Sequence, residues 1–445
     1  MIIMKFGGTS VGSSESIKKV IEIISNETRD KIVVLSAFSG ITNLLVDINH
    51  QYELSDDNID KTIFQLENRC LEVINPLFNT ASYLQAAQNF VSIKIEQIKQ
   101  IINSPFSKEN TQIIIGQGEI ISTNIIQFFL QEKKVSSTLI SALDFMKKDE
   151  KDEPNSNFIS TNIRQIVEKN KANLYITQGF ICRDTKGAFS NLDRGGSDYT
   201  ASLIGAGIRA IEIQIWTDID GMHNNDPRFV ENTFSLEEIS FDEAAELAYF
   251  GAKILHPQSL IPAKNNNIPV LLKNTFDPEK KGTLIKNNTK RNGVSSIAAK
   301  DGITAIKIKS YRMLLAYGFL KRVFEVFETY KTPIDMITTS EVAVSLTIDN
   351  GDFLPEISTD LKEFGSVEVD TDLSIICVAG DFSQNKEGLS ANVFNALKHI
   401  SVRMISYGGS NYNISLLVKT SDKVNALNSL NKVLFKKQLK GLEIN

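Results

Sequence analysis

The sequence predicts an α/β protein with a largely parallel sheet, followed by a duplicated α+β region. The first observation is that short apolar runs, typical of buried strands, alternate with amphipathic runs through roughly the first 300 residues. The second is that one helix-strand pattern occurs twice near the C-terminus. A length of 445 residues allows about three domains at roughly 150 residues each.

Within the first part, strands and helices are expected in alternation. Helices are expected over residues 13–25 and 199–206 and from near Phe241 onward, and segment 75–103 has the apolar spacing of an inserted helical pair. The expected strands cover residues 2–6, 31–36, 112–115, 173–178, 212–217 and 269–272.

A polar stretch at residues 286–293 is rich in turn formers and predicts a domain boundary. Beyond it, Val323-Phe324 precedes an apolar run at 344–348, and Val393-Phe394 precedes one at 414–418. Both members of the pair shift by 70 residues. This shift favours two copies of a small α+β unit, with chance similarity of two amphipathic segments as the alternative.

Composition excludes several classes of protein. The 48 Lys and Arg against 53 Asp and Glu give a net charge of -5, which offers no basic surface for nucleic acid or an anionic membrane. Cys70, Cys182 and Cys377 are widely spaced and odd in number, so neither a disulfide framework nor a paired-cysteine zinc site is expected. No apolar run reaches the roughly 20 residues of a membrane span. The apolar stretch at the N-terminus is too short for that of a signal peptide. We expect a cytoplasmic protein.

The segment Lys5-Phe-Gly-Gly-Thr-Ser-Val-Gly12 ends an expected strand and leads into a helix. Backbone N–H groups in a glycine turn form an anion site, and a lysine adds a charge suited to phosphate. The order of residues differs from that of a Walker A loop. Taken alone, the segment is also compatible with a purely structural turn.

The segment Asp193-Arg-Gly-Gly-Ser-Asp198 also lies between an expected strand and a helix. Its glycines let the backbone approach a ligand closely, and Arg194 can hold a carboxylate or phosphate bidentately. A surface turn is the alternative.

Two further motifs follow expected strands or helices. Thr217 and Asp218 come at the C-terminal end of an apolar strand, which is where open α/β sheets bind ligands. Lys253 follows an amphipathic run, where compensation of the helix dipole is the ordinary explanation for a lysine.

Seven segments follow one another along the chain: Lys5-Phe-Gly-Gly-Thr-Ser10, Ser36-Ala-Phe-Ser-Gly-Ile-Thr-Asn43, Gly116-Gln-Gly-Glu-Ile-Ile-Ser-Thr123, Arg194-Gly-Gly-Ser-Asp198, Trp216-Thr-Asp218, Asp226-Pro-Arg228 and Phe250-Gly-Ala-Lys-Ile-Leu-His-Pro257. In sequence and order they resemble the motifs of aspartate kinases. The region from Gly302 onward resembles the tandem ACT regulatory domains of that family, and Ile337-Thr-Thr-Ser-Glu341 resembles its monofunctional, lysine-sensitive branch.

The resemblance implies a fold and a division of the chain. It implies an amino-acid-kinase domain over residues 1–290, with a three-layer αβα arrangement around an open, mostly parallel sheet. Two ferredoxin-like ACT units would follow at 300–372 and 373–445, possibly intertwined. The implied reaction is transfer of the ATP γ-phosphoryl group to the side-chain carboxylate of L-aspartate, with Mg²⁺ carried by ATP and no separate metal site. This is the first step of lysine, threonine and methionine biosynthesis.

By the same resemblance, Lys5 would contact the transferring phosphate and Asp198 would orient groups around it. Aspartate would be held by Thr42, Glu119 and Arg194, with Ser36 as a further candidate, and Gly195, Gly196 and Ser197 would line the meeting point of the substrates. The nucleotide would be bound by Gly7, Gly8, Ser10, Thr217, Asp218, His223, Arg228, Lys253 and Ile254.

A regulatory amino acid, with lysine as the first expectation, would bind in the first ACT unit. The residues retained there are Met313, Phe319, Leu320, Asp335, Ser340 and Glu341. Leu315 and Ala316 replace polar residues of the lysine-sensitive branch. The ACT units would also join subunits into a homodimer or homotetramer.

Two departures from the family pattern keep alternatives open. Asp193 stands where a glycine usually precedes the Arg-Gly-Gly-Ser-Asp run, and His223 replaces a tyrosine. One alternative is another amino-acid kinase of the same fold, acting on glutamate or acetylglutamate. The other is an inactive amino-acid sensor. The length leaves no room for a fused dehydrogenase.

Overall fold

The computed structural model describes residues 1–192, 195–251, 255–289, 293–310, 317–382, 388–436 and 438. Contacts along the chain divide it into two compact units. Unit 1 comprises Met1–Met222, Glu237–Phe241 and Ile254–Thr289. Unit 2 comprises His223–Leu236, Asp242–Lys253 and Lys290–Asn445, so two short segments that precede residue 290 group with the C-terminal region.

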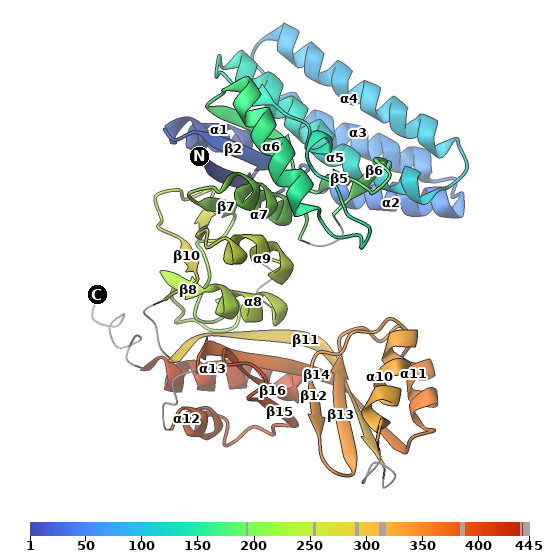
Figure 1. The fold of residues 1–445 in the computed structure, drawn as a ribbon, viewed down its shortest axis with the longest axis vertical. Helices are drawn as coiled ribbons and strands as arrows, with labels where there is room; N and C mark the ends of the chain where they lie inside the picture. The colour runs from blue at the N-terminus through green and yellow to red at the C-terminus, as the bar shows by residue number, and fades with distance from the viewer. Residues whose placement is uncertain are drawn as a thin grey trace. The chain divides into compact units, whose positions relative to one another are not determined.

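Unit 1 is built on an eight-stranded sheet (Figure 1). Six neighbouring strands of the sheet, in the spatial order β3, β4, β2, β1, β7 and β9, are parallel to one another, whereas β10 runs antiparallel to β9. Their parallel direction places the C-terminal ends of these six strands at one edge of the sheet. The spatial order is β3 (Thr138–Leu139), β4 (Leu174–Gln178), β2 (Lys31–Leu35), β1 (Ile2–Phe6), β7 (Ile213–Thr217), β9 (Val270–Asn274), β10 (Thr283–Lys286) and β8 (Glu238–Ser240).

Helices cover both faces of this sheet. One face, which carries Ile2, Met4 and Phe6, packs against apolar side chains of the first five helices. On the other face α7 lies close to β1 and β7, because Gly205 leaves room for Ile3 and Ile213. These helices are α1 (Ser14–Asn26), α2 (Ile41–Leu54), α3 (Ile59–Ile74), α4 (Ala81–Ile102), α5 (Lys108–Glu132), α6 (Ser156–Asn170), α7 (Gly196–Ile208) and α9 (Pro257–Asn265). The three-layer αβα arrangement is confirmed.

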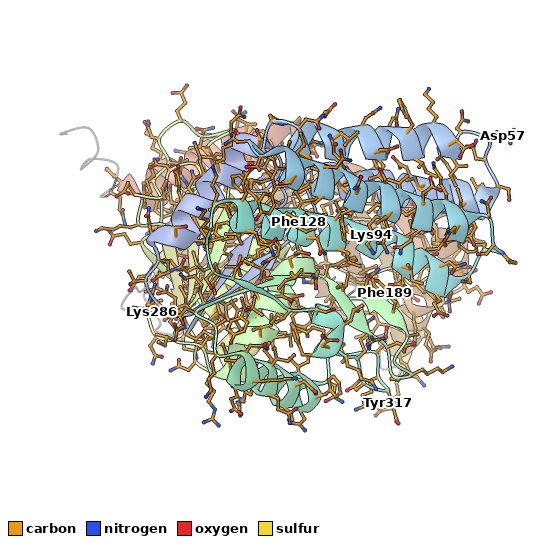
Figure 2. All side chains as sticks on the ribbon, turned by 90° about the horizontal axis from the view of Figure 1, so that it is seen from above. Asp57, Lys94, Phe128, Phe189, Lys286 and Tyr317 are labelled. Carbon is orange, nitrogen blue, oxygen red and sulfur yellow. The ribbon has the colours of Figure 1, made fainter. Side chains whose placement is uncertain are left out.

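Helices α2 to α5 form a layer that extends beyond the sheet. Figure 2 shows Asp57, at the turn between α2 and α3, at one end of this layer, with Lys94 on α4 and Phe128 on α5. By length and composition alone, helix α5 could cross a membrane. However, 67% of its most apolar stretch is buried inside the protein. It is the central helix of this layer. Beside it lies a small hairpin of β5 (Ile181–Arg183) and β6 (Phe189–Asn191).

Two expectations for this region are wrong. Residues 112–115 are not a strand; they lie in the first half of α5, because a short apolar run fits a buried helix as well as a buried strand. Segment 75–103 holds one helix, α4, rather than a pair, and its neighbour α3 comes earlier in the chain. Asn75 is the C-cap of α3.

Unit 2 contains a six-stranded antiparallel sheet with the order β12 (Ile337–Thr339), β13 (Ala343–Ile348), β11 (Gly293–Lys309), β14 (Ser366–Asp381), β16 (Asn413–Lys419) and β15 (Met404–Tyr407). The helices packed with it are α10 (Phe319–Thr329), α11 (Leu354–Leu361), α12 (Leu389–Ala396) and α13 (Lys423–Leu434). Most of α8 (Phe241–Tyr249) also groups with this unit.

The duplication in unit 2 is visible in two separate apolar cores. One core contains Val323 and Leu346, and the other contains Val393 and Leu416, which are their counterparts at a spacing of 70 residues. The long strands β11 and β14 run through both repeats, since residues 304–309 of β11 pair with β13 while residues 293–300 pair with the second half of β14. The two repeats therefore exchange strands. Gly302, with φ of +76°, lies at the register shift between these halves.

Segment His223–Leu236 is anchored in unit 2 by buried amides. The Asn224 side chain is fully buried, donates to Asn431 Oδ1 at 2.9 Å and accepts from the backbone N–H of Phe234. Asn225 donates to Leu427 O at 3.3 Å. Val230 packs in the second apolar core beside these amides. Burial without these hydrogen bonds would leave several amide groups unpaired.

We therefore predict that Asn431→Leu destabilises the protein. The substitution removes the acceptor of the buried Asn224 amide, at an expected cost of about 1–3 kcal/mol in the free energy of unfolding. Urea unfolding measures this, with the exposed Asn392→Leu on α12 as the matched control. Equal stability of the two variants would contradict the prediction.

Candidate functional site

The predicted site residues of unit 1 gather at the edge where the parallel strands end. Of these, Lys5 lies near the end of β1, Ser36 follows β2 and Thr217 ends β7, while Gly179, which was not predicted, follows β4. These strands are neighbours in the sheet, in the order β4-β2-β1-β7. The N-terminus of α7 supplies the fifth component, since Asp198 lies in its first turn.

Lys5 and Asp198 form the central ion pair of this edge. Lys5 Nζ lies 2.7 Å from Asp198 Oδ1, and the two side chains are 11% and 15% exposed. A Cβ added to Gly7 would lie 3.5 Å from Lys5 Nζ, so the absence of a side chain at Gly7 keeps the space beside the ammonium open. The arrangement places a partly buried cation, accessible from the glycine turn, beside a helix N-terminus.

The glycine turn of residues 7–12, here called the phosphate loop, lies against residues 36–40, here called the carboxylate loop. A Cβ on Gly8 would lie 3.2 Å from Ala37 O, and one on Gly12 would lie 2.9 Å from Ser39 Cβ. The hydroxyl of Ser10 is buried and lies 2.7 Å from Thr275 Oγ1. Ser10 therefore fixes the phosphate loop to the end of β9, a contact that the sequence pattern does not reveal.

Glu119 brings a buried carboxylate to the carboxylate loop. Its Oε1 accepts a hydrogen bond from Ala37 N at 3.3 Å, while Oε2 is buried and has no hydrogen-bond partner within the described part of the chain. Burial raises the pKa of Glu119 to about 7, and its backbone hydrogen bonds oppose this only partly. An unpaired buried carboxylate is suited to receive a cationic group of a ligand.

Ser36 and Ser197 join the carboxylate loop to α7. Ser36 Oγ lies 2.9 Å from Ser197 Oγ, and Ser36 O accepts from Ser122 Oγ at 2.8 Å. Gly179 permits this approach, because a Cβ there would lie 2.3 Å from Ser197 Oγ. Thr42, in contrast, lies exposed in the first turn of α2, with no contact to this group among the interactions described.

Glycines shape the N-terminus of α7. Gly195 has φ of +71° and is the N-cap, and Gly196 has φ of +44°. Gly195 O accepts hydrogen bonds from the N–H groups of Asp198 and Tyr199, which closes the first turn. The predicted residue Arg194 and its neighbour Asp193 lie outside the described residues.

The predicted nucleotide residues are distributed between the two units. In unit 1, Thr217 Oγ1 donates to Asp218 Oδ1 at 3.1 Å; Thr217 is half-buried and Asp218 is exposed. In unit 2, Arg228 is 75% exposed and its guanidinium is held by Asp226, with Nη2 and Oδ2 2.6 Å apart. His223 Nδ1 lies 3.4 Å from Thr233 Oγ1. Lys253 and Ile254 lie outside the described residues.

The predicted effector carboxylate, Asp335, is already paired. Its side chain is only 1% exposed, and its Oδ1 lies 2.8 Å from Lys300 Nζ and accepts from Tyr249 Oη at 2.8 Å. Lys300 also pairs with Asp349 at 2.7 Å. Burial, together with the hydrogen bond to Asp335, raises the pKa of Tyr249. The Asp335 Oδ2 atom is buried and has no hydrogen-bond partner within the residues that the structure covers.

The other predicted effector residues that the structure describes lie in two different places. Phe319 is buried in the first apolar core of unit 2 and Leu320 packs against that core. Ser340 lies in the turn before β13, where its N–H donates to Ala343 O, and Glu341 is exposed in the same turn. Met313, Leu315 and Ala316 lie outside the described residues.

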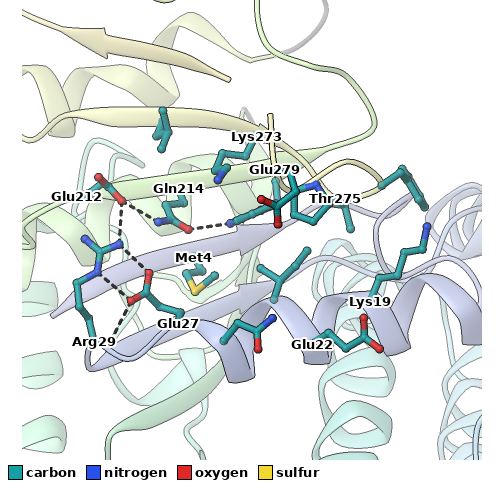
Figure 3. Close-up of a pocket in the computed structure, with 16 residues that line it drawn as sticks. Met4, Lys19, Glu22, Glu27, Arg29, Glu212, Gln214, Lys273, Thr275 and Glu279 are labelled. Carbon is teal, nitrogen blue, oxygen red and sulfur yellow. Dashed lines mark hydrogen bonds and ion pairs between the residues drawn. The ribbon is translucent and has the colours of Figure 1, made fainter. Parts of the chain in front are cut away.

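A cavity of about 510 Å³ opens on the sheet face opposite Lys5, between α1 and strands β7 and β9 (Figure 3). Its polar side chains bond to one another: Arg29 pairs with Glu27 and Glu212, Glu212 accepts from Gln214, and Gln214 accepts from Trp216 Nε1 at 2.9 Å. The Trp216 ring also stacks on Phe6. The network joins the segment before β2 to the start of β7, and the Phe6–Trp216 stack joins β1 to β7 near their C-terminal ends.

Comparisons with known proteins show which family this chain resembles. The model of the amino acid kinase family matches residues 1–274, and an ACT domain model matches residues 376–434. The lysine-sensitive aspartokinase 3 of Escherichia coli is 32% identical over 98% of this chain and 99% of its own length. The chloroplastic aspartokinase 3 of Arabidopsis thaliana is 32% identical over 97% of this chain and 81% of its own length.

Solved structures show the same similarity. The structure of E. coli aspartokinase III in complex with aspartate and ADP has a TM-score of 0.85 at 31% identity, covering 98% of this chain and all of that one. The same enzyme in complex with lysine and aspartate gives a TM-score of 0.84 at 31% identity, covering 98% and 99%.

The buried Glu119 predicts a specific pH dependence of stability. Because its pKa is raised from 4.5 to about 7 in the folded protein, its contribution to the free energy of unfolding is full below pH 4.5 and is lost as the pH rises through 7. That loss amounts to about 3 kcal/mol at most. We expect Glu119→Gln to remove it, as measured by urea unfolding at pH 5 and pH 8.

The exposed Glu109→Gln on the same helix is the matched control and should keep the wild-type pH dependence. A Glu119→Gln variant whose stability falls between pH 5 and 8 as much as that of the wild type would refute the assignment.

Proposed function

This chain belongs to the amino acid kinase family as an aspartate kinase, and from that premise we propose how its own residues carry out the reaction. The reaction transfers the γ-phosphoryl group of ATP to the side-chain carboxylate of L-aspartate and yields 4-phospho-L-aspartate and ADP. The observation that carries the proposal is that the Lys5–Asp198 pair lies at the end of β1, while the unpaired Glu119 of α5 contacts Ala37 in the loop after the neighbouring strand β2.

The nucleophile requires no strong general base, because a carboxylate is already ionised at pH 7. Catalysis then depends on position and on neutralising the charge of the transferring phosphoryl group. Lys5 supplies the positive charge, and Asp198 orients the Lys5 ammonium at 2.7 Å. The phosphate loop and the N-terminus of α7 add backbone N–H groups directed at the same edge.

Aspartate is recognised through its charged groups. Glu119 Oε2 receives the α-ammonium, which replaces the missing partner of this buried carboxylate and favours its ionised form. Arg194 holds the α-carboxylate, and Thr42 and Ser36 add hydroxyl groups. Ser197, whose Oγ lies 2.9 Å from Ser36 Oγ, lines the point where the two substrates meet together with Gly195 and Gly196.

The nucleotide is bound by Gly7, Gly8 and Ser10 of the phosphate loop and by Thr217, Asp218, His223, Arg228, Lys253 and Ile254. Mg²⁺ arrives with ATP, since a hard cation bound to phosphate oxygens needs only one or two protein carboxylates. Asp198 at the edge of the sheet is such a carboxylate. Among the described residues, no group of three His, Cys, Asp or Glu side chains is placed to hold a metal ion by itself.

The setting of the reaction is also proposed. The three cysteines, Cys70, Cys182 and Cys377, are buried and form no disulfide bond, which suits the reducing cytoplasm. We place the enzyme there as a homodimer or homotetramer joined through its ACT units. Light scattering after size-exclusion chromatography tests the oligomeric state.

For regulation, we propose that lysine binds in the first ACT unit at Asp335 and inhibits the enzyme. Lys300 already presents an ammonium to this carboxylate, so the free amino acid must displace Lys300 or use the unpaired Oδ2 atom. Tyr249 of α8 donates to the same carboxylate. A change of partner at Asp335 therefore acts directly on α8.

The activity is tested with Mg-ATP, hydroxylamine and a panel of acidic substrates. We expect hydroxamate formation with aspartate and a loss of kcat by about 10²–10³-fold in Lys5→Met, because a charge aimed at the transition state is removed. The control is Lys18→Met on α1, whose exposed side chain donates from Nζ to the carbonyl of Pro76. Product with glutamate or acetylglutamate alone would favour a different acceptor, and no turnover with any acid would favour an amino-acid sensor.

The regulatory proposal predicts a contrast between two lysine variants. In Lys300→Met the buried Asp335 carboxylate loses its charged partner, so millimolar lysine should raise the Tm of this variant more than that of the wild type. Lys307→Met, which removes a solvent-exposed ion pair with Glu368, is the control. If lysine neither inhibits the wild type nor shifts the Tm of any variant, Asp335 does not bind it, and threonine is the next effector to test.

A further inference from the structure

We infer that Arg69 is a positioning residue that holds the phosphate loop and the carboxylate loop in register for phosphoryl transfer. The inference rests on the proposed function, because the two loops matter together only if one carries the donor and the other the acceptor. Arg69 belongs to α3, outside every motif of the sequence, and its side chain is 28% exposed.

The guanidinium of Arg69 binds one backbone carbonyl from each loop. Its Nη2 donates to Gly12 O at 2.6 Å, at the end of the phosphate loop, and its Nε donates to Ser39 O at 3.1 Å, in the carboxylate loop. The remaining Nη1 lies 3.2 Å from Glu72 Oε2, one turn further along α3. Arg69 therefore bridges the two loops and is itself oriented by its own helix.

The bridge completes a connection that starts at the strand ends. Where the loops begin, Ser36 N donates to Phe6 O at 3.2 Å and continues the pairing of β1 with β2. Further along, the loops touch at the glycines, since no Cβ fits between Gly12 and Ser39 without displacement. Arg69 fixes the end remote from the strands, so the separation of the loops is defined at both ends.

Arginine is suited to this role in a way that lysine is not. The planar guanidinium offers donors in a fixed fork and reaches two carbonyls at once, whereas an ammonium acts as a single point charge. The contacts are to backbone atoms, so Arg69 acts through the loops and not on either substrate. A shift of about 1 Å between donor and acceptor costs on the order of 10²-fold in rate, which sets the expected size of the effect.

The test compares Arg69→Met and Arg69→Lys with Arg164→Met. Arg164 of α6 also donates to a glycine carbonyl of unit 1, that of Gly207, at 2.7 Å, but at the C-terminal end of α7. We expect Arg69→Met to lower kcat by about 10-fold to 10²-fold with both KM values changed less than about threefold. Arg69→Lys should fall between it and the wild type. Arg164→Met should keep the wild-type kcat, and the two methionine variants should lose similar amounts of Tm.

A second measurement separates positioning from folding. Methylguanidine added to Arg69→Ala should restore part of kcat in a saturable manner, and should leave Arg164→Ala unchanged. The inference is overturned if Arg69→Met retains the wild-type kcat, if its loss of activity only follows the unfolded fraction, or if methylguanidine gives no rescue. A wild-type protein without aspartate-dependent turnover would instead overturn the proposed function.

Discussion

The Lys5–Asp198 ion pair is the contact on which the arrangement of the site depends. It joins the end of the first strand to the first turn of α7, two elements far apart in the sequence. The contact is possible only because α7 lies close to the sheet, and two glycines allow this: Gly205 makes room for Ile213, and Gly179 makes room for Ser197. The same close approach brings Ser197 to Ser36, so the pair and the carboxylate loop form one connected group.

Glu119 lowers the stability of the free protein, and we propose that the same carboxylate recognises the substrate. A buried carboxylate with one unpaired oxygen is unfavourable in the free protein, as its raised pKa indicates. The surrounding apolar packing of α5 holds it in place, and in the proposed site the α-ammonium of aspartate would supply the missing interaction. Asp335 in unit 2 is also a buried carboxylate, but its charge is compensated within the protein by Lys300 and Tyr249.

Local patterns predicted the parts of this molecule that local physics determines. The strand and glycine turn after Met1, the helix after Ser13 and the repeat spacing of 70 residues depend on near neighbours, and the structure contains them. The strand expected at 112–115 was wrong. In so short an apolar run, the hydrophobic spacing of a buried strand cannot be distinguished from that of a buried helix. No sequence pattern pointed to Arg69, Thr275 or Lys300. Each contacts a partner that is distant in the sequence and comes near only in the folded chain.

The division of the chain changes how regulation is understood. Segments His223–Leu236 and Asp242–Lys253 belong to unit 2 by their contacts, yet each is continuous at both ends with segments of unit 1. The first carries His223 and Arg228 and is anchored by the buried Asn224 and Asn431 amides, and the second ends at Lys253. The segment that carries two residues proposed to bind the nucleotide is thus anchored, through Val230 and Asn224, in the same unit as the ACT repeats. In the proposed regulation, an effector bound to those repeats would therefore act on the unit that includes His223 and Arg228, two of the residues proposed to bind the nucleotide.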